Sequence, residues 1–301
     1  MITYSNLGNK GNLGNQLFQI ASTIGIAEKN QQDYCFPFWE YSNYFDFQFN
    51  KCLANDNWTS VRERQFNYHN WDVSNGNFDL NGWLQSERYF SNVNIKNIFH
   101  FKSDFEKNLL EKYHYLFSKK TILVTVRRGD FVNNPNYFQL SYKFYLTALL
   151  HQFNNLQEYN IIFTSDSITY CKKHFSFLPN VFFLENLKPI EQLCLGSKFD
   201  HYIISNSTFS WWMAWLGEKD KTKIIRPKQI FDGEYSKKND ESDYFPNRWI
   251  VHDENHFELA NSYWKLKIYG YLYELGAKMK YVFNSQKKII KNRIKEILGY
   301  K

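Results

Sequence analysis

Two adjacent arginines, followed by glycine and aspartate, come directly after a short apolar run at Arg127-Arg128-Gly129-Asp130. Successive side chains leave a strand on opposite sides, so one arginine can reach a cleft while the other braces the loop. A guanidinium keeps its charge, and its fork of donors matches phosphate oxygens. Asp130 can hold one arginine in place. The segment predicts a pyrophosphate contact, with a surface Arg–Asp pair as the alternative.

A second polar segment, Ser205–Ser210, precedes an apolar stretch that contains Trp211 and Trp212. The backbone N–H groups at the start of a helix are unpaired and attract anions, and short hydroxyl side chains add donors there. Ser207 or Thr208 can also cap this helix, and capping is compatible with phosphate binding. The predicted donor-binding residues of the segment are Asn206, Ser207, Thr208 and Ser210.

A glycine-rich loop, Gly11–Gln16, runs into an apolar helical pattern. It lacks the G-x-G-x-x-G spacing of a dinucleotide site and the lysine of a P-loop, so a nicotinamide enzyme is a poor fit. A tight turn that presents Asn15 and Gln16 at a helix start suits close approach to a sugar or a phosphate. Ser165 and Asp166 are further candidates, because they directly follow another predicted strand.

Short β-branched runs alternate with helical patterns over the second half of the chain. The expected strands are 121–126, 160–164, 181–184, 201–205 and 223–226, and the expected helices between them are 142–153, 167–175, 190–196 and 210–216. This alternation indicates a parallel sheet with helices on both faces. Ligands of such sheets bind beyond the carboxyl ends of the strands, which is where the polar segments fall.

The pattern divides the chain into three parts. We expect a looser N-terminal α/β domain at 1–115 with a helix at 16–27, a doubly wound domain at 116–252, and a basic helical tail at 253–301. In the tail, lysines and isoleucines recur at helical spacing. This amphipathic pattern predicts contact with an anionic membrane surface, and helix packing or an oligomer contact are the alternatives.

Composition excludes several classes. The net charge of +7 sits mostly in the tail, so nucleic-acid binding is not expected. Four cysteines without C-x-x-C spacing argue against zinc. Neither a signal peptide nor an apolar run long enough to span a membrane is present, so we expect a reducing cytoplasm and free thiols. Aromatic residues make up 20% of the chain and can pack on sugar rings, although most should fill the core.

Several blocks in order resemble the bacterial α-1,2-fucosyltransferases of glycosyltransferase family 11. Gly11–Gln19 looks like the family's G-G-L-G-N-Q-L-F-Q opening, and Leu80–Phe90 is similar to its L-x-G-Y-x-Q-S-E-K-Y-F block. Arg127–Phe131 matches R-R-G-D-Y, and Ile204–Leu216 resembles I-x-N-S-S-F-S-W-W-x-A-W-L. Segments at 227–231 and 246–250 fit the closing blocks. The resemblance covers roughly residues 7–250.

The resemblance implies a GT-B-like α/β fold, with two Rossmann-like domains facing a cleft. It implies inverting, metal-independent transfer of L-fucose from GDP-fucose to a galactose-type acceptor in surface glycan synthesis of the O-antigen or lipopolysaccharide type. It places Arg128 on the β-phosphate. The implied partners are the nucleotide-sugar donor, with no cofactor, and an oligosaccharide or lipid-linked glycan acceptor. The implied location is cytoplasmic, including the inner face of the cytoplasmic membrane.

Two positions depart from the family pattern. Thr125 stands where the family has histidine, and Ser167 stands where it has a second aspartate; in related fucosyltransferases these two residues contact guanine. Donor identity is therefore open, and a different nucleotide sugar or a non-catalytic glycan-binding role are the alternatives. An inverting transfer needs a base near the acceptor hydroxyl. Asp130 and Glu87 are the candidate bases, beside Arg128 as the expected catalytic cation.

Overall fold

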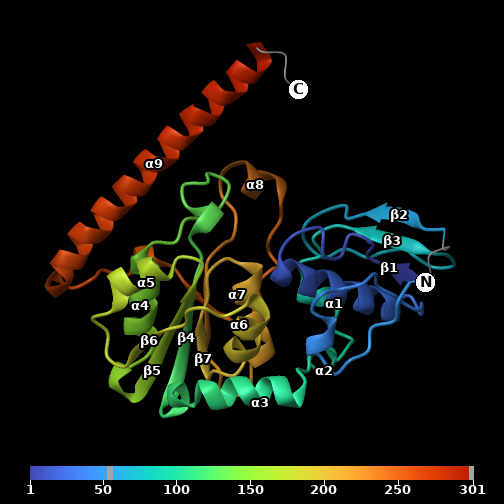
Figure 1. Cartoon of the computed structure of the whole chain (residues 1–301), viewed down its shortest axis with the longest axis horizontal. Coiled ribbons are helices and arrows are strands. Elements are labelled where there is room, and N and C mark those ends of the chain that lie inside the picture. The colour runs from blue at the N-terminus through green and yellow to red at the C-terminus, as the bar shows by residue number, and fades with distance from the viewer. Residues whose placement is uncertain (53–56, 298–301) are drawn as a thin grey trace.

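The computed structural model describes residues 1–52 and 57–297, and in it the second half of the chain forms a six-stranded parallel sheet (Figure 1). The strand order is β6-β5-β4-β7-β8-β9. The strands are β4 (Lys120–Val126), β5 (Tyr159–Ser165), β6 (Val181–Phe183), β7 (His201–Ile203), β8 (Ile224–Pro227) and β9 (Ile250–His252). The five predicted strands are confirmed. β9 was not predicted, because the strand is only three residues long and its residues show no clear alternation of apolar and polar side chains.

Helices connect these strands as the alternation predicts. They are α4 (Tyr142–Gln152), α5 (Ile168–Phe175), α6 (Pro189–Gly196) and α7 (Thr208–Gly217). A further short helix, α8 (Gly233–Lys238), lies between β8 and β9 and was not predicted. Before the sheet, α3 (Ser103–Lys112) ends before Tyr113, and a separate 3-10 helix follows it. The 3-10 helices are Ser42–Tyr44, Glu87–Tyr89, His114–Phe117, Gly129–Phe131, Leu156–Glu158, Glu254–His256 and Asn261–Tyr263.

Both faces of this sheet are covered, because its central strands β4 and β5 are buried at nearly every position. Leu123 of β4 belongs to the core that includes α6 and α7, whereas Ile122 and Val124 belong to the core that includes α4 and α5. Alternate residues of a strand point to opposite faces, so one short run supplies both cores. The carboxyl ends of β4, β5 and β7 are thereby held at one edge of the sheet.

A smaller parallel sheet lies in the first hundred residues. It has the order β1-β3-β2, from β1 (Ile2–Thr3), β2 (Thr59–Arg62) and β3 (Phe78–Asn81). The helices of this part are α1 (Leu13–Lys29) and α2 (Ile95–Ile98). Phe18 of α1 packs on Trp211 and Trp212 of α7, with ring centroids 4.6 and 5.0 Å apart. The two parts therefore share a core, and their division near residue 115 stays a prediction.

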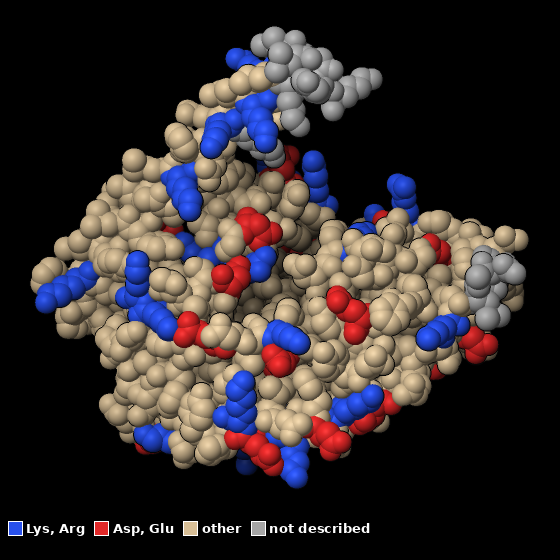
Figure 2. All heavy atoms as spheres, in the orientation of Figure 1, with Lys and Arg blue, Asp and Glu red and all other residues tan. Residues whose placement is uncertain are grey.

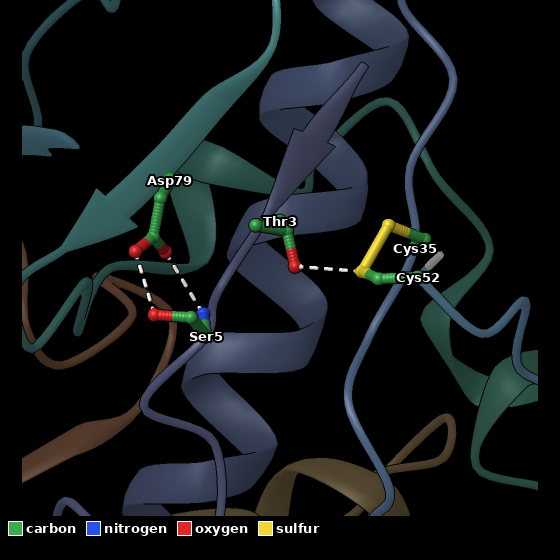
Figure 3. Close-up of a disulfide and its surroundings, with 5 residues drawn as sticks. All are labelled: Thr3, Ser5, Cys35, Cys52 and Asp79. Carbon is green, nitrogen blue, oxygen red and sulfur yellow. Dashed lines mark hydrogen bonds between the residues drawn. A yellow bond between two sulfur atoms is a disulfide. The ribbon is translucent and has the colours of Figure 1, made fainter. Parts of the chain in front are cut away.

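Two cysteines that we expected as free thiols form a disulfide, Cys35–Cys52 (Figure 3). Backbone bonds between Phe36 and residues 50 and 52 bring the two segments together. Thr3 Oγ1 lies 3.1 Å from Cys52 Sγ. The expectation is wrong for this pair because the pairing depends on tertiary contact across a 17-residue separation. Cys171 and Cys194 are free and buried, as expected.

The chain ends in one long helix, α9 (Trp264–Ile297), which stands out beside the large sheet (Figure 1). The predicted tail helix is thus confirmed within the described residues, and positions 298–301 of that prediction lie outside them. No helix in the described part of the chain is long and apolar enough to cross a membrane.

Candidate functional site

A cavity of about 1080 Å³ lies where the two sheets' loops meet, and the surface is hollowed there (Figure 2). The N-terminal part supplies the Gly11–Gln16 loop, and the large sheet supplies the ends of β4, β5 and β7. Of the twelve predicted site residues, the cavity is lined by Asn15, Gln16, Arg127, Asp130, Ser165, Asp166, Asn206, Ser207, Thr208 and Ser210. Arg128 and Glu87 are not among the lining residues.

Two helices begin at this cavity, α1 and α7. Residues of the first turn of each line it, and neither first turn contains an acidic residue. A Cβ atom at Gly14 would lie 2.5 Å from the backbone nitrogen of Phe209, so only glycine lets the two helix starts approach this closely. Both helix N-termini direct partial positive charge toward the cavity, which favours a bound anion.

Arg127 faces the cavity between two carboxylates. Its Nη2 pairs with Asp130, and its Nη1 lies 3.0 Å from Asp166 Oδ2. Asp166 also accepts a 2.9 Å bond at Oδ1 from the backbone nitrogen of Arg128, which fixes the turn after β4. Asp130 therefore braces an arginine, the role that its position suggested, and is not poised as a free base.

Arg128 points away from the cavity, with only 5% of its surface exposed. Its Nη1 donates to Leu140 O at 3.0 Å, and its Nη2 donates to Glu274 of α9 at 2.9 Å. The guanidinium lies 4.4 Å from the ring centroid of Tyr170. Opposite orientations of the two arginines are confirmed, but the cavity-facing one is Arg127. This placement contradicts the phosphate contact expected of Arg128, because α9 supplies a carboxylate on the other side.

The side chains of the segment before α7 differ in whether other parts of the protein engage them. Ser207 is the N-cap and accepts from Phe209 N at 3.3 Å. The side-chain amide of Asn206 donates hydrogen bonds to Phe138 O and to Ile230 O, so it connects the neighbouring loops. Ser210 Oγ lies 2.8 Å from Ser205 Oγ. The structure gives Thr208 no internal side-chain partner within the described residues, so its hydroxyl remains available at the cavity.

The two positions that depart from the family pattern lie in different places. Thr125, at the end of β4, lines the cavity and accepts from Ser205 N at 3.3 Å. Ser167 does not line the cavity, because the chain turns into α5 there and its backbone nitrogen bonds to Ser165 Oγ. Of these two positions, only Thr125 therefore lines the cavity.

The glycine-rich loop is held from both sides. Gln16 donates to Gly11 O at 3.0 Å and accepts from Trp39 Nε1 at 2.9 Å, so its amide supports the loop. Asn15 Oδ1 accepts from Gln85 Nε2 at 2.8 Å. This contact joins two of the motif blocks at the cavity wall.

Glu63 positions the Trp83–Gln85 segment and was not found by sequence reasoning. Its two oxygens accept from Trp83 N at 2.6 Å and Leu84 N at 2.9 Å. Leu84 has φ of 56°, a left-handed conformation that these two bonds hold. Burial raises the pKa of Glu63 to about 6, and the two backbone bonds limit that rise. No local motif marks such a carboxylate.

Glu87 does not line the cavity and lies in a cluster of ion pairs instead. Arg248 binds both of its oxygens at 2.7 and 3.0 Å, and Trp215 Nε1 donates to it at 3.1 Å. Glu87 is therefore not placed at this cavity, and its role as a base stays a prediction. The carboxylate that sequence reasoning missed is Glu40, which lines the cavity from the N-terminal side. Within the described residues, no ion pair engages it.

Aromatic side chains form much of the remaining wall. Tyr41 and Trp83 come from the N-terminal part, and Trp83 is partly exposed. Burial raises the pKa values of Tyr41 and Tyr137, so both phenols stay neutral hydrogen-bond donors. The aromatic lining residues are Tyr41, Phe66, Trp83, Phe131, Tyr137, Phe209, Phe231, Tyr235 and Tyr244. Across residues 1–52 and 57–297, no group of three His, Cys, Asp or Glu side chains could hold a metal ion.

The sequence profile of a family described as Glycosyl transferase family 11 matches residues 26–253. An Escherichia coli protein named Alpha-1,2-colitosyltransferase is 29% identical over 189 residues, which cover 58% of this chain and 62% of that protein. The Escherichia coli O-antigen biosynthesis glycosyltransferase WbnK is 29% identical over 137 residues, covering 43% and 44%. The chain thus matches less than two thirds of the length of either relative.

Solved fucosyltransferases share the fold. NodZ from Bradyrhizobium superposes with a TM-score of 0.51 at 13% identity, covering 71% of this chain and 91% of that one. POFUT1 in complex with GDP-fucose gives 0.52 at 10%, covering 74% and 96%. An Arabidopsis thaliana FUT1 mutant in complex with GDP gives 0.51 at 12%, covering 76% and 71%. The α/β, GT-B-like architecture expected from the motifs is confirmed.

Proposed function

Because this chain belongs to glycosyl transferase family 11, and so is a glycosyltransferase, we propose that it moves L-fucose from GDP-fucose to a galactose-type acceptor. The observation that carries the proposal is the cavity, where Arg127 and the N-termini of α1 and α7 surround one space. A nucleotide diphosphate is the anion that such a space fits. The named activities of the relatives support a sugar transfer to surface glycans.

The proposed reaction is a direct displacement that inverts the donor carbon. The acceptor hydroxyl forms a bond to C1 of the sugar while the bond from C1 to the diphosphate oxygen breaks. The electron pair leaves with GDP, whose charge Arg127 and the helix N-termini of α1 and α7 stabilise in place of a metal ion. The hydroxyl proton passes to a carboxylate, for which we propose Glu40. Asp130 and Asp166 are engaged with Arg127.

The acceptor side of the proposal rests on the N-terminal wall. The faces of Trp83 and Tyr41 can pack on a galactose ring, and Glu40, which precedes Tyr41 in the sequence, lines the same cavity. We propose an acceptor that is an oligosaccharide or a lipid-linked glycan, used at the inner face of the cytoplasmic membrane. A second candidate donor carries colitose, since Thr125 lines the cavity and a relative bears that activity in its name.

A nucleotide panel tests donor class. Thermal melting with GDP, UDP and CMP should show stabilisation by GDP alone, because binding to the folded state raises the midpoint by mass action. Transfer from GDP-fucose to a β-galactoside should then proceed in excess EDTA. A shift with none of the three nucleotides rejects the proposal. Activity lost in EDTA and restored by manganese rejects metal independence.

Glu40→Gln tests the base. We expect kcat to fall by about 100-fold or more, the usual loss when a general base is removed, while GDP affinity stays unchanged. Glu28→Gln, at an exposed glutamate near the end of α1, is the matched control and should keep wild-type activity. Near-normal kcat in Glu40→Gln would remove Glu40 from the mechanism without affecting the donor assignment.

A further inference from the structure

The first three turns of α9 pack one face against the large domain. Leu266 and Tyr273 join the core that contains α4 and α5, and Gly270 is buried against Tyr142. Glu274, on the same face, pairs with Arg128 at 2.9 Å. These residues recur every three or four positions, which places them on one side of the helix. This side of α9 is therefore occupied by contacts within the protein.

The opposite side of α9 is apolar and unpartnered. Its apolar stripe includes Trp264, Ile268, Leu272, Leu275, Met279 and Val282, whose exposed fractions run from 43 to 66%. At about 100° per residue these positions face away from Leu266, Gly270 and Tyr273. Six large apolar side chains in a row on an exposed surface form a patch that marks an interaction site in most proteins.

Positive charge borders this stripe. Trp264–Ile297 contains nine Lys or Arg and two Glu, so the helix has a formal charge of +7, as large as that of the whole chain. Lys267 and Lys278 follow one border at helical spacing, and Lys280 and Lys287 follow the other. Cations recur along α9 in Figure 2. Among the described side chains of the helix, the acidic one is Glu274, which turns inward to Arg128.

We propose that this face of α9 docks on an anionic lipid bilayer. An apolar stripe with lysines along both borders matches the acyl and headgroup layers of a membrane surface, where each basic residue contributes about 1 kcal/mol. A second copy of the chain is a poor occupant, since it would bring one +7 helix against another. Charge complementarity selects the lipid surface.

The docked helix lies next to the donor cavity. Glu274 of α9 forms an ion pair with Arg128, and Arg127, the residue before Arg128, lines the cavity. Docking of α9 on a membrane therefore brings the cavity close to the bilayer. A lipid-linked acceptor in the same membrane is then within reach of the site. This last step rests on the proposed function, whereas the docking itself does not.

Vesicle sedimentation with the full chain tests docking. We expect binding to vesicles of phosphatidylcholine with phosphatidylglycerol, and little binding to phosphatidylcholine alone. Leu272→Gln with Met279→Gln keeps helix propensity and charge but removes two apolar side chains, so partitioning should fall about tenfold or more. Lys278→Gln with Lys280→Gln should weaken binding to anionic vesicles by a similar factor. Val251→Gln, at an exposed apolar residue of β9, should bind as wild type does.

Three outcomes overturn the proposal: no binding to anionic vesicles, equal binding of the Leu272→Gln/Met279→Gln variant, or equal binding to neutral vesicles. Light scattering adds a fourth, because a wild-type dimer that this variant converts to a monomer identifies the stripe as a self-interface. The assay contains no nucleotide and measures no turnover. A chain that sediments with anionic vesicles but fails the GDP melting test would uphold docking and reject GDP-fucose as the donor.

Discussion

Arg127 and Arg128 show how strongly the surroundings of a residue decide its role. Both are fully charged guanidinium groups after the same strand, yet Arg127 lies among the cavity-lining residues and Arg128 lies under α9. Asp166 contributes to both, through its side-chain contact to Arg127 and its bond to the backbone of Arg128. One carboxylate therefore holds the turn that separates the two side chains.

We predict that Arg127→Ala and Arg128→Ala fail in different ways. Arg127→Ala should lower kcat/KM by about 100-fold, or about 3 kcal/mol, because a charge-assisted contact to the leaving diphosphate is lost. Its melting temperature should stay near that of wild type. Arg128→Ala should lower the free energy of unfolding by roughly 1–3 kcal/mol, because Glu274 loses its partner and Tyr170 loses a cation. Calorimetric GDP titration and thermal melting of both variants measure the difference.

The reverse result is informative. If Arg128→Ala abolishes GDP binding at an unchanged melting temperature, the guanidinium must leave Glu274 and enter the cavity when the donor binds. The family resemblance would then have identified the correct arginine. Glu274→Ala serves as the control, since it removes the same ion pair while it keeps Arg128.

At the scale of elements, the contact between α1 and α7 determines how the two sides of the cavity are placed. Each helix starts at the cavity, and their aromatic side chains interlock behind it through Phe18, Trp211 and Trp212. Gly14 lies at the closest approach, 2.5 Å for an added Cβ from the nitrogen of Phe209. The junction thus sets how the two halves of the cavity face each other.

We predict that Gly14→Ala destabilises the protein by about 1–3 kcal/mol, the usual cost of overpacking, and weakens GDP binding at least tenfold. Gly276→Ala is the matched control. It makes the same change in the interior of α9 with open space around the new methyl group, so it should stabilise by about 0.5–1 kcal/mol. Chemical denaturation and GDP titration distinguish the two. Equal behaviour of both variants would show that α1 can move away from α7 at no cost.

At the scale of the molecule, the Cys35–Cys52 bond constrains the N-terminal part that carries Glu40 and Tyr41 between the two cysteines. A cross-link across 17 residues restricts the unfolded chain and typically stabilises by about 3 kcal/mol. Disulfides are typical of oxidising surroundings. The bond therefore links the wall of the cavity that Glu40 and Tyr41 form to the redox state of the protein.

Thiol titration checks this feature. The denatured, unreduced protein should react at two cysteines, Cys171 and Cys194, and at four after reduction. Reduction should lower the free energy of unfolding by about 3 kcal/mol in the wild type. A Cys35→Ser/Cys52→Ser variant should not respond to the reductant. Four reactive thiols before reduction would show that the bond does not form.

The sequence alone predicted five of the six strands of the large parallel sheet, because these strands are short apolar runs separated by helical patterns. Ten of the twelve residues that the sequence predicts for the site line one cavity, since residues that follow strand ends or begin helices meet at one edge of such a sheet. Their roles stay predictions. Those features are local in the chain.

Tertiary structure decided what depends on distant partners. Arg128 turns from the cavity because Glu274 lies 146 residues away on α9, and Glu87 is neutralised by Arg248, 161 residues away. Glu40 and Glu63 became recognisable only when folding placed one at the cavity and the other beneath Trp83. The side-chain identity of a carboxylate or an arginine records its charge, whereas its role depends on which opposite charge, backbone group or open space the fold brings beside it.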